Sequence, residues 1–337
     1  MVCEEVREAV AGSGLFARDR PVIAMLSGGR DSSCLLDVAV AILGAASLSA
    51  LHVNYGLRPD ADADEHHCVD LCRQLGVEIQ IAHAGPAPSG QSRVDPSAID
   101  SLGPEPSTGE DRPSGNLQAW ARELRYGEAT RMAEQRDGLI ATGHTADDQL
   151  ETILYRLAAS PGRRALLGMP ASEGRLIRPL LAVSREQTAA YCEARGLQWR
   201  EDESNDDERF ARARVRNRLV PALRTVHSAA AANVLRTASL LREETELLES
   251  LVSEELAGRR SIALARLGEL PSALARLVVV RLAEEAAGTY VPQAGERVQQ
   301  ILALGRRGGR AELHVGGRAG AVIRDGVLEM IKLPPRE

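Results

Sequence analysis

Lysine is almost absent from this sequence, and the absence excludes several classes of protein. The 337 residues contain 41 lysines and arginines together, and Lys332 is the only lysine among them. A Walker-type phosphate loop requires a lysine directly after its glycines, whereas Lys332 stands between Ile331 and Leu333. Walker-type ATPases are therefore excluded. A Schiff base between a lysine and pyridoxal phosphate is disfavoured for the same reason.

Cysteines and long apolar runs are also scarce. The five cysteines are odd in number, widely scattered and without a C-x-x-C pair, which favours a reducing cytoplasm over a disulfide scaffold. No apolar run approaches the roughly 18 residues of a membrane span, and the acidic N-terminus is unlike a secretory signal. We therefore expect a cytoplasmic protein with no membrane partner. The net charge of −6 excludes nucleic-acid binding by overall charge but permits a local basic patch.

The first half of the chain alternates short apolar segments with amphipathic ones. The apolar segments predict strands at 21–26, 48–54, 77–83 and 138–142. The amphipathic segments predict helices at 33–43, 61–76, 116–136, 147–159 and 184–197. This order predicts an α/β fold, a parallel sheet with helices on both faces. Ligands bind such a sheet at the carboxyl ends of its strands.

Composition divides the chain into two domains. Residues 1–200 carry the α/β pattern, interrupted at 84–115 by a segment rich in Pro, Ser, Gly and Asp that predicts a mobile insertion. Such an insertion is more often inert than a lid. Residues 201–226 form an arginine-rich connector, and 227–337 predict a mainly helical domain, with helices at 227–258, 268–287 and 292–304 and a tail of short strands.

The first candidate site is the segment Ser27-Gly28-Gly29-Arg30-Asp31-Ser32, between the first strand and the first helix of this pattern. Two glycines allow a sharp turn, and the N–H groups at the start of a helix attract anions such as phosphate. An aspartate in such a loop is explained if a divalent cation joins it to the phosphate. The alternative is an ordinary turn with serine and aspartate caps.

The second candidate site follows the predicted strand at 138–142. His144, Asp147, Asp148 and Glu151 lie within eight residues there, at the same edge of the sheet. They could bind Mg²⁺ and position a reacting group, although aspartates at the start of a helix are also favourable caps. A weaker cluster of His66, His67, Cys68 and Cys72 lacks the usual spacing of a zinc site, so we expect buried helix cysteines there.

Arginines form two further groups. Arg122 and Arg125 share one face of a predicted helix and are suited to clamping phosphate, or are simply solvated. A second group has six arginines and no acid within 209–224. It could hold nucleic-acid phosphates, pair with the acidic segment 201–208, or form a solvated helix face. Its members are Arg209, Arg212, Arg214, Arg216, Arg218 and Arg224.

Several segments together resemble the tRNA(Ile)-lysidine synthetase family, a branch of the PP-loop N-type ATP pyrophosphatases with a Rossmann-like fold. The first is SGGRDS at 27–32, which is similar to the PP-loop itself. The others occur in the family's order at 52–65 (HVNYGLRPDADADE), 116–126 (NLQAWARELRY), 141–152 (ATGHTADDQLET), 176–181 (LIRPLL) and 196–223. The PP-loop alone would indicate only the superfamily.

The resemblance implies a ligase that modifies tRNA. ATP would activate the wobble cytidine of an isoleucine tRNA with a CAU anticodon, and free lysine would then displace AMP to form lysidine. The implied ATP site is Ser27, Gly28, Gly29, Arg30, Asp31 and Ser32, with Mg²⁺ on Asp31 and Asp148. The implied catalytic residues are Asp31, His144, Asp148, Arg122 and Arg125. The implied tRNA contacts are Arg178, Arg212, Arg214, Arg216 and the helical domain 227–337.

Two alternatives come from other functional classes. A sulfur-inserting PP-loop enzyme would need reactive or cluster-binding cysteines, and the scattered cysteines here lie away from the motifs. A non-catalytic nucleotide-binding sensor would need neither the aspartate-rich second motif nor the arginines of 209–224. Both alternatives predict that lysine is not transferred to tRNA.

Overall fold

The computed structural model describes residues 2–17, 19–57, 59–85, 117–159, 162–200 and 211–334. The chain divides into two compact units, and the described residues of the first unit end at Ser239. The division falls inside helix α10 (Ala230–Leu256), later in the chain than the predicted boundary at 226. From residue 86 onward, the predicted insertion at 84–115 lies outside the described residues.

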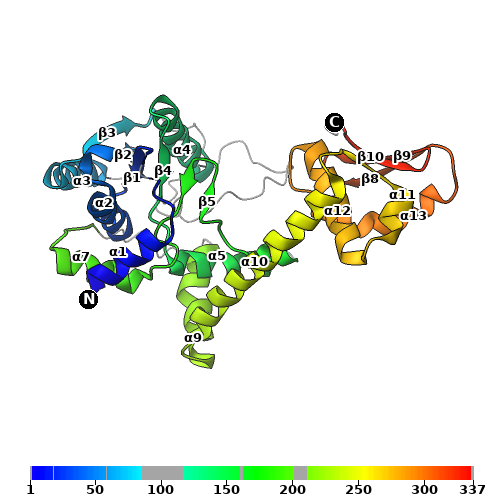
Figure 1. Ribbon diagram of the computed structural model, residues 1–337. Helices are drawn as coiled ribbons and strands as arrows, with labels where there is room; N and C mark the ends of the chain where they lie inside the picture. Colours follow the sequence, from blue (N-terminus) through cyan, green and yellow to red (C-terminus); the bar gives the residue numbers. More distant parts are fainter. Residues whose placement is uncertain are drawn as a thin grey trace. The chain divides into compact units, whose positions relative to one another are not determined.

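A six-stranded sheet forms the centre of the first unit (Figure 1). Its strand order is β3-β2-β1-β4-β6-β5, and all neighbouring strands are parallel except β5, which runs antiparallel to β6. The strands are β1 (Val22–Met25), β2 (Leu48–Asn54), β3 (Glu78–His83), β4 (Leu139–Ala141), β5 (Ser172–Glu173) and β6 (Leu176–Ile177). The predicted parallel sheet is confirmed.

Helices cover both faces of this sheet because successive side chains of each strand point to opposite faces. Val22 and Ala24 of β1 pack into a core with α1, α2, α3 and α7. Ile23 and Met25 of the same strand point to the other face and pack against α4. Figure 1 shows α2 and α4 on opposite sides of the sheet. The helices are α1 (Val2–Gly12), α2 (Arg30–Leu43), α3 (Ala61–Leu75), α4 (Leu117–Gln135) and α7 (Arg185–Arg195), with a 3₁₀ turn, η1 (Ala45–Ser47), after α2.

The arginine-rich segment packs on helix α5 (Ala146–Ala159), which follows β4. This segment runs from α8 (Ala211–Arg214) through the π-helical turn η4 (Val215–Leu219) into α9 (Val220–Val226). Leu150 of α5 meets Val215 and Val220 in a small core. A short helix, α6 (Arg163–Leu166), also contacts α5.

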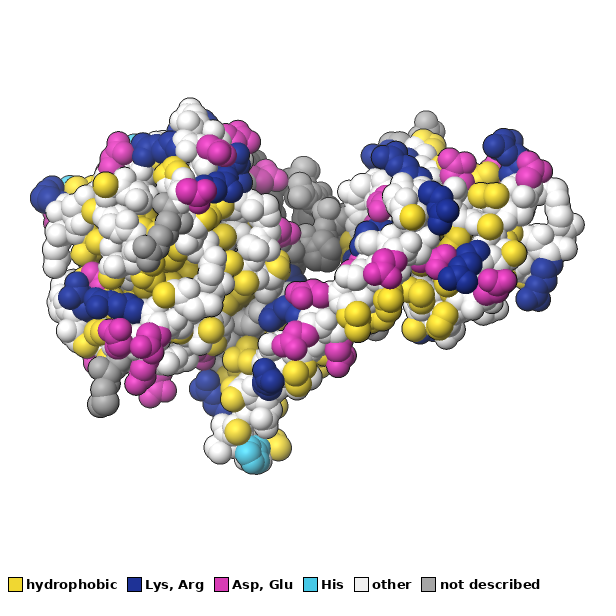
Figure 2. Space-filling model, in the orientation of Figure 1, with side chains coloured by type: hydrophobic (Ala, Val, Ile, Leu, Met, Phe, Trp, Pro, Cys, Tyr) yellow, Lys and Arg dark blue, Asp and Glu magenta, His cyan; other side chains and the backbone are white. Residues whose placement is uncertain are grey.

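The second unit is built on an antiparallel sheet of order β7-β10-β9-β8. Its strands are β7 (Ser261–Ala263), β8 (Ala311–Gly316), β9 (Ala319–Arg324) and β10 (Val327–Lys332). Its helices are α11 (Leu264–Glu269), α12 (Ser272–Ala287), the 3₁₀ segment η5 (Pro292–Arg297) and α13 (Val298–Gly305). This agrees with the predicted helical domain with a small β tail. Among the residues described in both units, no helix combines the length and the apolar character of a membrane span. Figure 2 shows charged side chains of both signs on the surface of each unit.

Candidate active site

The loop between β1 and α2 makes a tight turn that requires its first glycine. Gly28 has a φ of +84°, and a Cβ there would lie 3.3 Å from the Sγ of Cys68. Gly29 is the N-cap of α2, and the Ser32 hydroxyl donates to the Gly29 carbonyl oxygen at 2.9 Å. The Ser27 hydroxyl lies 3.1 Å from that of Ser32. The loop therefore brings two hydroxyl groups to the positive end of a helix, which is a suitable place for an anion.

The second motif touches this loop directly. Gly143 follows β4, and a Cβ on it would lie 3.0 Å from the carbonyl carbon of Asp31. Because β4 pairs with β1, both motifs leave the same edge of the sheet, as the sequence predicts. His144, a member of the second motif, is buried, and its Nδ1 atom lies 2.8 Å from the Thr142 hydroxyl.

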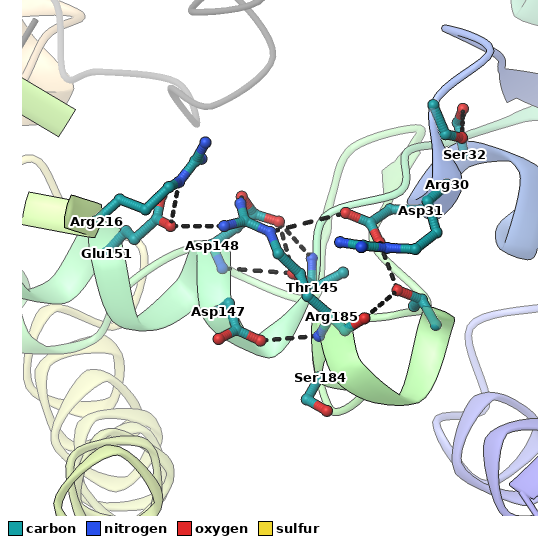
Figure 3. Close-up of polar contacts among 12 residues, drawn as sticks. Arg30, Asp31, Ser32, Thr145, Asp147, Asp148, Glu151, Ser184, Arg185 and Arg216 are labelled. Atoms are coloured by element: carbon teal, nitrogen blue, oxygen red, sulfur yellow. Dashed lines mark hydrogen bonds and ion pairs between the residues drawn. The ribbon is translucent and has the colours of Figure 1, made fainter. Parts of the chain in front are cut away.

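Asp148 is a buried carboxylate with two sets of donors. One oxygen, Oδ2, accepts from the Thr145 amide and from the Thr145 hydroxyl, both at 2.8 Å. The other, Oδ1, accepts from Arg185 at 2.5 Å (Figure 3). The same oxygen accepts from Arg212 at 3.2 Å. Burial acts to raise the pKa of Asp148, but the two guanidinium groups outweigh it and hold the pKa far below its ordinary value. Asp148 is therefore ionised at neutral pH.

Glu151, one turn further along α5, accepts hydrogen bonds from three arginines. Its Oε1 accepts from Arg185 and from Arg216, each at 2.8 Å, and its Oε2 accepts from Arg212 at 2.9 Å and from Arg216 at 3.1 Å. The side chain is only 3% exposed. Burial acts to raise the pKa of Glu151, but the arginines together lower it below the ordinary value. Glu151 thus joins α5, α7 and the α8–η4 segment.

Arg185, the first residue of α7, joins the two motifs (Figure 3). Its guanidinium group contacts Asp148 and Glu151, and its Nε atom lies 3.8 Å from the Oδ2 of Asp31. Its backbone N–H donates to Asp147 at 2.8 Å, which satisfies one of the unpaired donors at the start of α7. Three helix N-termini, those of α2, α5 and α7, therefore meet at one cluster of charges.

The pKa of Asp31 is shifted in the opposite direction from that of Asp148. Its Oδ1 accepts from the Thr188 hydroxyl at 2.5 Å and from Arg30 at 3.3 Å. Burial, followed by repulsion from the nearby Asp148, nevertheless raises the pKa of Asp31 above its ordinary value. The two carboxylates are thus close enough to interact while their pKa values are shifted in opposite directions.

The other predicted arginines lie in different surroundings. Arg122 and Arg125 lie on α4, with their guanidinium carbons 4.7 Å and 5.5 Å from the centre of the Tyr126 ring. Arg178 has no exposed surface and donates to the Pro170 carbonyl oxygen at 2.7 Å. Burial, with Arg122 nearby as a further contribution, lowers the pKa of Arg178. A tRNA phosphate would reach Arg178 only if the surrounding residues moved, so that contact stays a prediction.

The arginines of the 209–224 segment are divided between the interior and the surface. Arg212 and Arg216 point toward the carboxylates of α5, and Arg224 pairs with Asp147 at 3.2 Å. Arg214 is exposed. Arg209 and the acidic segment 201–208 lie outside the described residues, and so does any pairing between them. The predicted tRNA contact is therefore compatible with the position of Arg214, whereas Arg212 and Arg216 neutralise carboxylates of the chain itself.

The predicted Mg²⁺ site on Asp31 and Asp148 has its ligand atoms engaged by the protein. Oδ1 of Asp31 and both oxygens of Asp148 accept hydrogen bonds, and Oδ2 of Asp31 faces Arg185. No group of three or more His, Cys, Asp or Glu side chains suited to a metal occurs among the described residues. Cys68 and Cys72 are fully buried in α3, as expected of helix cysteines.

Sequence reasoning placed Glu151 in the second candidate site without a specific role, and it did not include Arg185 or Thr188. One physical signal could have found Arg185, because a positive charge in the first turn of a helix is unfavourable next to the positive end of the helix dipole. An arginine directly after the N-cap Ser184 therefore indicates that carboxylates face it. Thr188 carries no comparable signal in the sequence.

Comparison with known proteins identifies relatives of this chain. A family described as the PP-loop domain matches residues 4–223. A tRNA(Ile)-lysidine synthase of Pseudomonas syringae pv. tomato is 35% identical over 242 residues, which is 70% of this chain and 48% of the relative. A tRNA(Ile)-lysidine synthase of Symbiobacterium thermophilum is 36% identical over 266 residues, covering 75% of this chain and 50% of the relative. The chain thus spans about half the length of these curated relatives.

A solved structure shares the fold. The U34-tRNA thiolase from Methanococcus maripaludis, solved with its [4Fe-4S] cluster, superposes with a TM-score of 0.52 at 17% identity and covers 72% of this chain and 80% of its own. At that identity the likeness concerns the fold alone. The family match includes the loop at 27–32, the second motif and the arginines that join them. Since it covers more than half of the sequence, the chain belongs to the PP-loop domain family.

Proposed function

We propose that this chain is an ATP-dependent ligase that attaches lysine to the wobble cytidine of an isoleucine tRNA with a CAU anticodon. The observation that carries the proposal is that the two motifs meet, with Arg185 between Asp31 and Asp148, in a chain about 35% identical to tRNA(Ile)-lysidine synthases. The described ion pairs at this place join five arginines to four carboxylates. Such a surplus of positive charge suits a polyphosphate. The arginines are Arg30, Arg185, Arg212, Arg216 and Arg224.

The reaction would take place in two displacements. The C2 oxygen of the cytidine attacks the α-phosphorus of ATP and pyrophosphate leaves, which produces an adenylated base. The ε-nitrogen of lysine then attacks C2, AMP leaves with the former C2 oxygen, and the nitrogen loses a proton. The loop at 27–32 would hold the phosphates at the N-terminus of α2, with the Ser27 and Ser32 hydroxyls as donors. Preorganised donors of this kind stabilise charge that develops on the leaving phosphates.

The remaining predicted residues have complementary roles in this proposal. Arg122 and Arg125 would face the adenylated base, since a guanidinium stacked on an aromatic ring is held in a fixed orientation. His144, whose Nδ1 atom lies 2.8 Å from the Thr142 hydroxyl, would face the reacting groups. Arg214 would contact the tRNA backbone. Mg²⁺ stays a prediction, and no step is assigned to it because the Asp31–Asp148 pair does not fit a cation while Arg185 occupies the space between them.

Cysteine burial argues against the sulfur-transfer alternative. Four of the five cysteines are buried, and Cys3 is partly exposed on α1. Burial raises the pKa of Cys72 to about 12 and raises the pKa of Cys68 as well, so both thiols stay protonated at neutral pH. A protonated thiol is a poor nucleophile and a poor ligand for iron. The described cysteines therefore do not support sulfur chemistry.

Incorporation of labelled lysine into tRNA tests the proposal. The full chain is incubated with labelled lysine, ATP, Mg²⁺ and total bacterial tRNA, and label that precipitates with acid and is released by ribonuclease is counted. We expect incorporation that requires ATP and produces one AMP and one pyrophosphate per lysine. Incorporation of labelled sulfur in a parallel reaction would favour the thiolase alternative. Nucleotide binding without release of AMP would favour the sensor.

A further inference from the structure

Arg185 occupies the space between Asp31 and Asp148, where the sequence predicts a cation. Its Nη2 atom lies 2.5 Å from Oδ1 of Asp148, and its Nε atom lies 3.8 Å from Oδ2 of Asp31 (Figure 3). Its Nη1 atom contacts Glu151 at 2.8 Å. One planar guanidinium group thus interacts with three carboxylates through three different nitrogens. The Arg185 side chain is 23% exposed.

The oxygens of the pair are consequently unsuited to a resident cation. Mg²⁺ requires near-octahedral oxygen ligands at about 2.0–2.1 Å and binds through one or two carboxylates together with water and phosphate. Both oxygens of Asp148 and Oδ1 of Asp31 already accept hydrogen bonds from the protein. The remaining oxygen, Oδ2 of Asp31, faces the positive charge of Arg185, which repels a second cation.

We propose that Arg185 is a positioning residue that holds Asp31 and Asp148 together and keeps divalent cations out of this pair while no nucleotide is bound. Without the guanidinium group, two carboxylates that already repel each other would lack a shared counter-ion. Asp148 would keep its contact with Arg212, but Asp31 would lose the charge that faces its Oδ2 atom. The pair would then form a cation site from residues of the PP-loop and of α5. The proposal concerns the nucleotide-free chain, so it does not depend on the lysine reaction.

Mn²⁺ binding to the full chain without nucleotide tests this role, because free Mn²⁺ is measured directly by electron paramagnetic resonance. We expect Arg185→Gln to bind one Mn²⁺ per chain at least about tenfold more tightly than the wild type, a difference of about 1.4 kcal/mol. Adding Asp31→Asn to this variant should remove the new site. Arg185→Lys, which keeps a positive charge at the position, should bind Mn²⁺ as weakly as the wild type.

Arg224→Gln is the matched control. Arg224 belongs to the same charge cluster but pairs with Asp147, and its side chain is 53% exposed. Its removal takes away one guanidinium group near α5 and leaves the Arg185 contacts in place, so Mn²⁺ affinity should stay at the wild-type level. An equal gain in Arg224→Gln and Arg185→Gln would mean that overall charge controls the affinity, and it would overturn the proposal.

The thermal midpoint gives a second measurement on the same proteins. A ligand that binds only the folded chain stabilises it by mass action, so Mn²⁺ should raise the midpoint of Arg185→Gln but not that of the wild type. If Arg185→Gln does not fold, the wild type and Arg185→Lys decide the question. One Mn²⁺ per wild-type chain, lost on Asp31→Asn, overturns the proposal. No such Mn²⁺ in either protein supports it.

Discussion

Replacement of Glu151 by glutamine removes the charge on which three arginines converge. Arg185 and Arg212 also contact Asp148, whereas the described ion pairs of Arg216 involve Glu151 alone. Removal of one partner from a buried ion pair costs about 3–5 kcal/mol, because the other charge stays buried without compensation. Here two of the arginines keep a carboxylate, and the Arg216 side chain is 24% exposed and can turn toward water. We therefore expect Glu151→Gln to lower the free energy of unfolding by about 3 kcal/mol, the lower end of that range.

Urea unfolding followed by tryptophan fluorescence measures this loss in the relevant part of the chain. The two tryptophans, Trp120 and Trp199, both belong to the first unit, so their emission reports that unit and not the second. A shift of the midpoint at constant slope gives the change in stability. The matched control is Glu128→Gln, because Glu128 pairs with Arg131 on the surface of α4 and is 28% exposed.

Surface pairs of this kind contribute about 0–1 kcal/mol, so the control should lose little. A Glu151→Gln protein within about 0.5 kcal/mol of the wild type, or equal to Glu128→Gln, would refute the reasoning. It would mean that the three guanidinium groups find water or Asp148 at no cost, and that Glu151 does not hold α5, α7 and the α8–η4 segment together.

Three further predictions follow from the same geometry. The pKa of Glu151 is lower in the folded state, so ionised Glu151 stabilises the fold above the ordinary glutamate pKa of about 4.3, and this contribution is lost as the pH falls further. The stability difference between the wild type and Glu151→Gln should therefore shrink in unfolding curves taken from pH 7 to pH 3. Gly143→Ala should weaken binding of a fluorescent ATP analogue at least about tenfold and destabilise the first unit by about 1–3 kcal/mol, because the added Cβ would meet the Asp31 backbone. The control Gly127→Ala, on the open surface of α4, should have neither effect. Arg214→Ala should lower the slope of log tRNA affinity against log salt by up to about one, measured by filter binding at several salt concentrations; an unchanged slope would assign Arg214 to a solvated helix face.

Hydrophobic patterning predicted most of the longer elements, but not the helix α1. Strand β2 has the predicted bounds, and helix α3 ends where Gly76 adopts the left-handed conformation expected of a C-terminal glycine. These elements are long enough for their apolar period to be visible in the sequence. The two-residue strands β5 and β6 were missed, because strands so short have no period and depend on pairing with a neighbour. The strand β7 was missed as well, whereas β4, of the same length, was predicted from its apolar segment.

The sequence predicted where the site lies in the fold, but not which side chains contact each other within it. Strand order brings Asp31 and Asp148 to one edge of the sheet, and the alternation of strands and helices is sufficient to anticipate this. The contacts of Arg185 and Arg212 depend on how α7 and α8 dock on α5, over separations of 37 and 64 residues. No local pattern encodes such docking. The arginines of 209–224 therefore suggested a nucleic-acid surface, although Arg212 and Arg216 point inward.

Geometry explains why position 185 is an arginine, and this explanation is separate from the scarcity of lysine in the whole chain. A guanidinium group is planar and presents five N–H donors, whereas an ammonium group is a single point charge on a flexible stem. Arg185 uses Nε toward Asp31, Nη2 toward Asp148 and Nη1 toward Glu151, so one side chain joins the PP-loop to two successive turns of α5. A lysine could keep the charge next to Asp31 and Asp148 but has one nitrogen for all three carboxylates. The connection between the two motifs therefore depends on the shape of the cation as well as on its charge.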